Sequence, residues 1–111
     1  MMQNEDPHIA RTFAALGEAT RLAMVQRLAA EGELAAGTLS DGLGLSMPAV
    51  SRHLKVLREA GLVTRRVQGQ QRIYAADPDA LARVSDWAAR QRAYWDLSLD
   101  RLEAAMDAET P

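Results

Sequence analysis

Residues 46–61 read Ser-Met-Pro-Ala-Val-Ser-Arg-His-Leu-Lys-Val-Leu-Arg-Glu-Ala-Gly, a stretch with clear signals for both ends of a helix. Ser46 is a preferred N-cap residue, and Pro48 lies in the first turn, where its missing N–H removes no helical hydrogen bond. Gly61 is typical of the position just after a helix end. The stretch therefore predicts one helix of about four turns.

This helix has two different faces. Val50, Leu54 and Leu57 recur at i, i+4 and i+7, which predicts a buried stripe. A helix that enters a major groove needs hydrogen-bond donors that reach base edges and cations that meet phosphates. The predicted exposed side offers both, in Ser51, Arg52, Lys55 and Arg58.

The formal net charge of −2 hides an uneven distribution. Residues 46–74 contain six Arg or Lys against Glu59 alone, whereas the segments on both sides are acidic. Affinity for a polyanion depends on the counterions released at the contact, so a local excess of positive charge is sufficient. A basic surface without a partner is the alternative, but the charge coincides with the capped helix, which favours DNA binding.

Length and composition place the chain among single-domain proteins. It has 111 residues, of which 48% are hydrophobic. No apolar run approaches the roughly 20 residues that span a bilayer, and the polar, acidic N-terminus is unlike a signal peptide, so we expect a cytoplasmic location. The absence of cysteine excludes disulfides and zinc sites built on thiolates.

Two helices are predicted at the start of the chain. Asp6-Pro7 has the pattern of an N-cap followed by proline, so the first helix should run over residues 7–16. The second should begin at Glu18 or Thr20 and end before Gly32. Its predicted inward residues are Leu22, Val25 and Leu28.

A third, short helix is predicted over residues 36–43, after an extended link at 33–35. Its pattern is weaker, because Gly37 and Gly42 would each cost about 1 kcal/mol relative to alanine inside a helix. Two short helices joined by a glycine-containing turn form a helix-turn-helix. We expect this third helix and the helix that follows Ser46 to be that pair.

After Gly61 the pattern changes to that of a β-hairpin. Two β-prone runs, 62–67 and 71–74, flank the turn signal Gln68-Gly69-Gln70. A hairpin of this size is marginal by itself and must pack on the helices. Side chains suited to contact the DNA backbone or minor groove surround its tip: Arg65, Arg66, Gln68, Gln70 and Arg72.

Asp77-Pro78 repeats the start signal and opens a predicted helix over residues 78–106, about 43 Å long. Apolar residues recur along it every seven positions, and the chain is too short to supply another layer that covers them. A second copy of the helix would cover them, which predicts a homodimer with recognition helices about 34 Å apart. Alternatively, the stripe packs on the subunit's own first helix, or on both. The predicted interface comprises Ile9, Phe13, Leu81, Val84, Trp87, Ala88, Gln91, Tyr94, Trp95, Leu99 and Leu102.

Three motifs occur in order along residues 9–76: Phe13-Ala-Ala-Leu-Gly-Glu-Ala-Thr-Arg-Leu, then Leu43-Gly-Leu-Ser-Met-Pro-Ala-Val-Ser-Arg-His-Leu-Lys-Val-Leu-Arg-Glu-Ala-Gly-Leu-Val, then Arg66-Val-Gln-Gly-Gln-Gln-Arg-Ile-Tyr. Together they resemble the ArsR family of bacterial winged-helix repressors. The terminal segment, with Trp87, Tyr94-Trp95-Asp96 and Leu99-Asp-Arg-Leu, resembles the metal-independent branch of that family.

The resemblance implies a mainly α winged helix-turn-helix fold with a small β-hairpin, ordered α-α-α-α-β-β-α. The chain would form one domain over residues 1–111, with a DNA-binding core at 7–76, a dimerisation helix at 77–106 and a tail at 107–111. It would be a dimeric repressor that occupies an inverted-repeat operator and leaves it when a signal arrives. The sequence does not identify an inducer.

By position, the resemblance assigns base reading to the start of the recognition helix. Many members have a polar residue at position 47, where this chain has Met47, a side chain that suits a thymine methyl group better than a hydrogen bond. His53 we expect to be packed or hydrogen-bonded rather than to read bases. The predicted DNA contacts are Met47, Pro48, Ser51 and Arg52 for bases, with Ser51 also able to bond a phosphate, Ser46 at the N-cap, Lys55 and Arg58 for phosphates, and Arg66, Gln68, Gln70 and Arg72 in the wing.

Other classes of function find less support in the residues. His8 and His53 are the only histidines, too few for a histidine-rich metal site in one subunit, so we expect no metal and no cofactor. No glycine-rich phosphate loop or nucleophile with an evident base is present, which argues against an enzyme. The main competitor is a dimer whose terminal helix binds another protein or a small apolar ligand. Its aromatic residues motivate that hypothesis, but aromatic residues at helical spacing usually pack.

Overall fold

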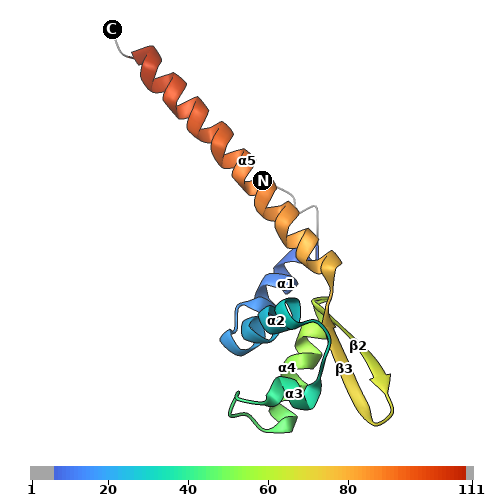
Figure 1. Ribbon diagram of the computed structural model, residues 1–111. Coiled ribbons are helices and arrows are strands. Elements are labelled where there is room, and N and C mark those ends of the chain that lie inside the picture. Colours follow the sequence, from blue (N-terminus) through green and yellow to red (C-terminus); the bar gives the residue numbers. More distant parts are fainter. Residues whose placement is uncertain (1–6, 110–111) are drawn as a thin grey trace.

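The computed structural model describes residues 7–109 and consists of a helical body, a short β-hairpin wing and one long projecting helix (Figure 1). The wing and the long helix leave the body in nearly opposite directions (Figure 1). The elements are α1 (Ile9–Leu16), α2 (Ala19–Glu31), β1 (Leu34–Ala35), α3 (Ala36–Ser40), α4 (Met47–Glu59), β2 (Val63–Gln68), β3 (Gln71–Ala76) and α5 (Pro78–Glu109).

The core forms where α1–α4 and the base of the wing meet. The apolar stripe predicted for α4 is confirmed, because its three residues are almost completely buried. Leu39 of α3 and Tyr74 of β3 join the same cluster, so the helices and the sheet share one core. The central buried residues are Met24, Val25, Leu28, Leu39, Val50, Leu54, Leu57 and Leu62.

The prediction for Leu22 is wrong, because this side chain is 41% exposed. The buried side of α2 carries Met24, Val25 and Leu28 instead. Arg21 continues that side toward the start of the helix and is half-buried. The apolar residues of α2 allow more than one phase of the helical period, and packing on α1, α4 and β3 selects this one.

Two predicted helix boundaries also change. The first helix begins at Ile9 with His8 at its N-cap, so Pro7 is not its first residue, and Asp6 lies outside the described residues. The third helix ends at Ser40, because Asp41 is extended and Gly42 takes a positive φ of 80°. A residue with positive φ cannot continue a right-handed helix.

The wing belongs to a three-stranded antiparallel sheet in the order β1-β3-β2. The predicted extended link at 33–35 contributes β1, in which Leu34 pairs with Tyr74. Gln68 pairs with Gln71, so the loop has only two residues, and Gly69 has a φ of 61°. A positive φ at the first of two central positions fits a type II′ turn, which suits the twist of hairpin strands. The predicted turn is confirmed.

Helix α5 has 32 residues, about 48 Å at the standard rise. The Asp77 carboxylate accepts the N–H of Asp79 at 2.9 Å, as expected for an N-cap. The helix continues to Glu109, so residues 107–109 belong to it rather than to a tail. Every residue from 92 to 108 is exposed, and the radius of gyration is 19.5 Å, against about 13 Å for a compact chain of this length.

Candidate nucleic-acid interface

Local hydrogen bonds fix both ends of α4. Ser46 Oγ accepts the N–H of Ala49 at 3.3 Å. At the other end, Gly61 has a φ of 75°, and the N–H of Leu62 donates to the carbonyl of Leu57 at 2.9 Å. This left-handed glycine reverses the chain direction and leads it directly into β2. The same residues therefore define the recognition helix and place the wing beside it.

The N-cap and the exposed side of α4 carry the DNA contacts predicted for the start of this helix. Met47 is 45% exposed, and Ser46, Pro48, Ser51 and Arg52 are also exposed. All five lie at the N-cap or within the first two turns. They share this position because the buried stripe holds the opposite side of the helix in the core.

A hollow of about 780 Å³ separates the N-terminal half of α4 from the wing. Met47 and Ser51 line it from the helix, and Gln70 and Arg72 line it from the wing. Asp41 after α3 also lines it and would repel a nearby phosphate. The tertiary structure thus brings together two groups of predicted site residues that are about 20 positions apart in the sequence.

The cation of Lys55 remains accessible, whereas Arg58 is half-buried. Lys55 Nζ lies 4.0 Å from Glu59 Oε1, and both side chains are more than half exposed. A pair with these properties is weak and can exchange for a phosphate contact.

Arg66 and Gln68 lie on a different face of the wing from Arg72. Arg66 pairs with Ile73, the neighbour of Arg72, and successive side chains of a strand point to opposite faces. Arg66 Nη2 and Nε donate to Glu33 Oε2 at 2.6 and 3.0 Å, and Nη1 donates to Gln68 Oε1 at 2.7 Å. The hydrogen bond and charge of Arg66 lower the pKa of the Glu33 carboxyl. The structure does not bring these two predicted contacts into the hollow.

The sequence places Arg65 beside the tip of the hairpin, but the family resemblance assigns it no DNA contact. It is exposed and pairs with Tyr74, which lies on the same face of β3 as Arg72. The sequence contained a signal for the face on which Arg65 lies, because Val63 and Arg65 are two residues apart and residues two apart in a strand share a face.

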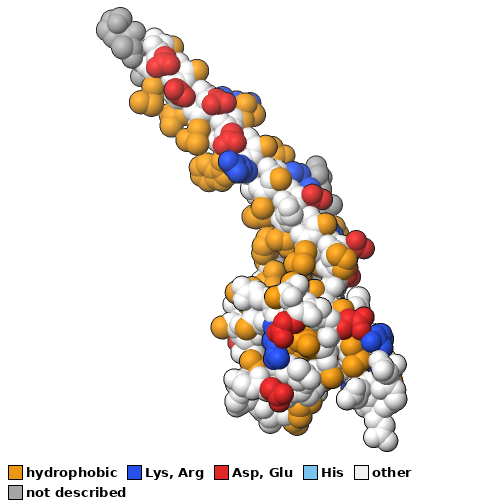
Figure 2. Space-filling model, in the orientation of Figure 1, with side chains coloured by type: hydrophobic (Ala, Val, Ile, Leu, Met, Phe, Trp, Pro, Cys, Tyr) orange, Lys and Arg blue, Asp and Glu red, His pale blue; other side chains and the backbone are white. Residues whose placement is uncertain are grey.

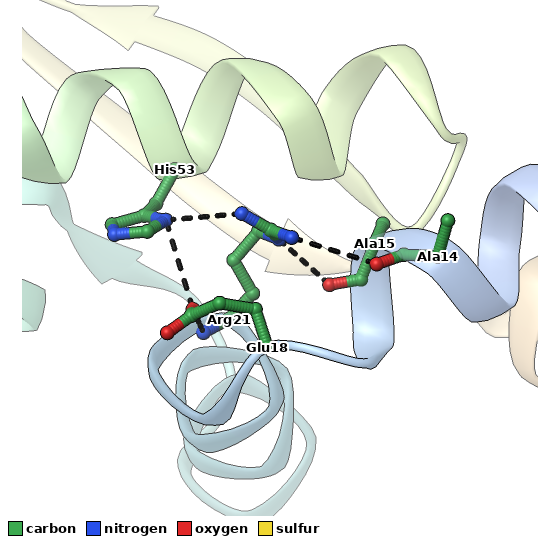
Figure 3. A network of polar contacts seen from close by, with 5 residues as sticks. All are labelled: Ala14, Ala15, Glu18, Arg21 and His53. Carbon is green, nitrogen blue, oxygen red and sulfur yellow. Dashed lines mark hydrogen bonds and ion pairs between the residues drawn. The ribbon is translucent and has the colours of Figure 1, made fainter.

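His53 points toward the junction of α1 and α2 (Figure 3), and it does not line the hollow. Its side chain is 23% exposed, and its Nδ1 lies 3.4 Å from Arg21 Nη1 and 3.8 Å from Glu18 Oε2. Glu18 is the N-cap of α2 and accepts the N–H of Arg21, which is the main cause of its lowered pKa. This placement agrees with a packed histidine rather than a base reader.

The first turns of α5 pack on the subunit's own α1. The rings of Phe13 and Trp87 meet edge to face, with centroids 4.9 Å apart, and Val84 and Gln91 are half-buried. Ile9 is only 3% exposed, so almost none of its surface is available to a partner. For these residues, the alternative holds in which the subunit's own α1 covers part of the apolar stripe of α5.

The rest of the predicted interface is exposed in the single subunit. Hydrophobic side chains gather along the edge of α5 (Figure 2). Trp95 is the most exposed large apolar residue on α5, at 69%. The other exposed members of the predicted set are Leu81, Ala88, Tyr94, Leu99 and Leu102, with Phe13 on α1.

No helix within residues 7–109 combines the length and the apolar character needed to cross a membrane. The same residues contain no group of three or more His, Asp or Glu side chains that could hold a metal ion.

The chain resembles known proteins in both sequence and structure. The family described as a helix-turn-helix domain matches residues 16–66. An HTH-type transcriptional regulator of Mycobacterium tuberculosis is 42% identical over 89% of each chain. The arsenical resistance operon repressor of Escherichia coli is 40% identical over 70% of this chain and 67% of its own length. The solved structure of an ArsR-like transcriptional regulator from a Rhodococcus species superposes with a TM-score of 0.77 at 28% identity, covering 88% of this chain and 92% of that one.

The fold, the exposed helix and the adjoining wing define a winged helix-turn-helix DNA-binding regulator, a class of transcription factors and not of enzymes. Within that class, the chain belongs to the ArsR family.

Proposed function

We propose that this regulator is a homodimeric repressor that binds an inverted-repeat operator in the cytoplasm. One observation carries the proposal: α4 is buried on one face and presents Met47, Ser51 and Arg52 on the other, with Arg72 of the wing across the same hollow. A helix held in this way can lie in a major groove while the wing follows the adjacent backbone.

The exposed side chains suit particular contacts. Arg52 can donate two hydrogen bonds to O6 and N7 of guanine, and Met47 can contact a thymine methyl group. Ser51 can bond a base edge or a phosphate. Lys55, Arg72 and the exposed Arg65 supply positive charge for phosphates, and the exchangeable Lys55–Glu59 pair leaves the lysine available. Arg66 and Gln68 are the weakest members of the proposed set, because Glu33 already occupies the arginine.

A second copy of the chain is the proposed cover for the exposed stripe of α5. Burying one large apolar side chain contributes about 1.5–3 kcal/mol, and the stripe presents several of them side by side. A two-fold dimer would set two α4 helices one DNA turn apart, roughly 34 Å. Binding of an unrelated protein or small ligand to this helix is the less favoured alternative, because the relatives are named as transcription regulators.

We assign the chain to the metal-independent branch. The E. coli relative is named for arsenical resistance, but this chain has no cysteine to supply thiolate ligands. His53, one of its two histidines, is engaged with Arg21 and lies near Glu18. The signal that releases the dimer from DNA would therefore be of another kind.

Selection of bound fragments from genomic DNA at physiological salt tests the proposal. The expected result is enrichment of one inverted repeat whose half-sites are about 10 base pairs apart or a multiple of that spacing. Fragments bound without sequence preference, or a single unrepeated half-site, would contradict it.

A further inference from the structure

Arg21 occupies a position where an apolar residue would be expected. With Met24, Val25 and Leu28 it follows the i, i+3, i+4, i+7 spacing of the side of α2 that faces the core, and it is half-buried. A charged group at such a position is unfavourable unless hydrogen-bond partners replace the water it loses. The partners of its guanidinium therefore explain why it lies there.

Two of these partners are at the end of α1 (Figure 3). Arg21 Nε donates to the carbonyl of Ala15 at 2.7 Å, and Nη2 donates to the carbonyl of Ala14 at 3.5 Å. Carbonyls in the last turn of a helix lack the i+4 partner of the helix interior and attract positive charge, although the Ala14 carbonyl also accepts the N–H of Gly17 at 3.3 Å. The shorter contact is the stronger one, so Ala15 is the anchor of the side chain.

The third guanidinium nitrogen faces the recognition helix. Arg21 Nη1 lies 3.4 Å from His53 Nδ1, and a hydrogen bond there requires the histidine proton to be on Nε2. Glu18 approaches the same Nδ1 and also accepts the N–H of Arg21 at 2.9 Å. One side chain thus joins the end of α1, the start of α2 and the middle of α4.

We propose that Arg21 is a positioning residue for DNA recognition, which holds α4 in its binding orientation through His53. The proposal rests on the function proposed above. The buried stripe of α4 supplies apolar contacts, which have little directional preference. A hydrogen bond to His53 is directional and acts at the residue next to Arg52. Because base contacts depend on side-chain position, losing this bond weakens recognition without removing any atom that touches DNA.

The size of the effect follows from the distances. The contact of Nη1 with His53 is near the long limit for a hydrogen bond, whereas the anchor at Ala15 is short. We expect Arg21→Met to weaken operator affinity about fivefold, or about 1 kcal/mol, as for the loss of one ordinary hydrogen bond.

The test measures operator affinity of the full chain together with its dimer dissociation constant, at a temperature well below the Tm of every variant. Asn carries an acceptor close to the position of His Nδ1, and Leu carries none. Arg21→Met and His53→Leu should each weaken operator affinity about fivefold, with an unchanged dimer dissociation constant. The operator affinity of His53→Asn should stay close to that of the unchanged chain. Arg11→Met, on the exposed side of α1, removes the same charge and should have little effect.

The salt dependence of binding separates positioning from direct contact. If Arg21 touches no phosphate, the slope of log affinity against log salt should not change in Arg21→Met. A slope reduced by about one would make Arg21 a DNA contact and overturn the proposal. Equal affinities for the unchanged chain, Arg21→Met and His53→Leu would also overturn it, as would equal losses in both His53 variants.

The test also gives a clear answer if a variant does not fold or if the unchanged chain does not bind DNA. If Arg21→Met does not fold, the comparison of His53→Leu with His53→Asn decides the matter alone. If the unchanged chain binds no operator, the proposed function fails, whereas an operator-binding chain with insensitive variants contradicts only the role of Arg21.

Discussion

Arg52 and Lys55 are neighbours on the exposed side of α4 but have different expected roles. Arg52 lies in the second turn of α4, where a side chain can reach base edges. Lys55 lies almost one turn further along the helix, where we expect it to contact DNA phosphates. Both carry the same charge. Replacing each with alanine therefore separates base reading from general attraction to DNA.

We expect Arg52→Ala to cost about 1–3 kcal/mol of operator affinity and to relax the preference for one base pair. Lys55→Ala should weaken binding to all DNA sequences alike and reduce the slope of log affinity against log salt by about one. Titrations against the operator and against duplexes changed at single positions distinguish the two. Preserved affinity and base preference in Arg52→Ala would reject its assignment as a base reader.

The Glu33–Arg66 pair makes a prediction about pH. Arg66 holds the pKa of the Glu33 carboxyl below its ordinary value of 4.5, so the folded state favours the charged form. The pair therefore adds stability above that pH, and its contribution disappears as pH falls through the lowered pKa. The Tm difference between the unchanged chain and Glu33→Gln should be largest near neutral pH and shrink in acid. A difference independent of pH would contradict the ion pair.

At the scale of the element, α2 shows which features of a helix its apolar spacing predicts and which it does not. Its existence and its end at Gly32 are evident from the sequence, but its phase is not. Leu22 and Met24 are both apolar, and only the packing of α2 on α1, α4 and β3 selects Met24. Arg21 then falls on the inner side, a result that hydrophobicity alone would not favour.

Two substitutions on α2 test that phase. Leu28 is buried and Leu22 is 41% exposed, so the same change to alanine should have unequal effects. We expect Leu28→Ala to lower the free energy of unfolding by about 2–5 kcal/mol, because it leaves a cavity. Leu22→Ala should lower it by about 1 kcal/mol or less. Denaturant titrations measure both, and similar losses would show that Leu22 is also inside.

In the wing too, local sequence predicts some features and contacts between distant residues decide others. Its strands and its Gly69 turn follow from β-prone runs and a turn signal. Its faces do not, because the pairing of Arg66 with Ile73 sends Arg66 toward Glu33 and leaves Arg72 at the hollow. Strand register, set by pairing across the sheet, decides which cations can meet DNA together.

At the scale of the whole molecule, the projecting α5 dominates the shape, with extents of 73 × 26 × 23 Å. The apolar edge of such a helix is unstable in water unless something covers it. The proposed dimer covers it and also fixes the distance between the two recognition helices. Dimerisation and operator recognition should therefore be linked.

Trp95→Ala should weaken the dimer, because 69% of this side chain is exposed in one subunit and is available for burial by the other. The expected loss is about 2–4 kcal/mol of association free energy, within the range for a central aromatic residue. Asp100→Ala, on the acidic side of the same helix, should leave association nearly unchanged. Sedimentation equilibrium over a range of concentrations measures both, and a Trp95→Ala protein with undiminished self-association would contradict the proposed interface.

The sequence by itself determined the recognition helix, the hairpin and the long terminal helix. Each depends on interactions between near neighbours: the Ser46 cap, the Gly61 and Gly69 reversals, and apolar residues repeated at helical spacing. Tertiary structure alone decided that Arg21 meets His53, that Glu33 holds Arg66, and that α1 covers only the first turns of α5. These contacts join residues 32, 33 and 74 positions apart, and local pattern carries no information about which distant groups the packed core will bring together.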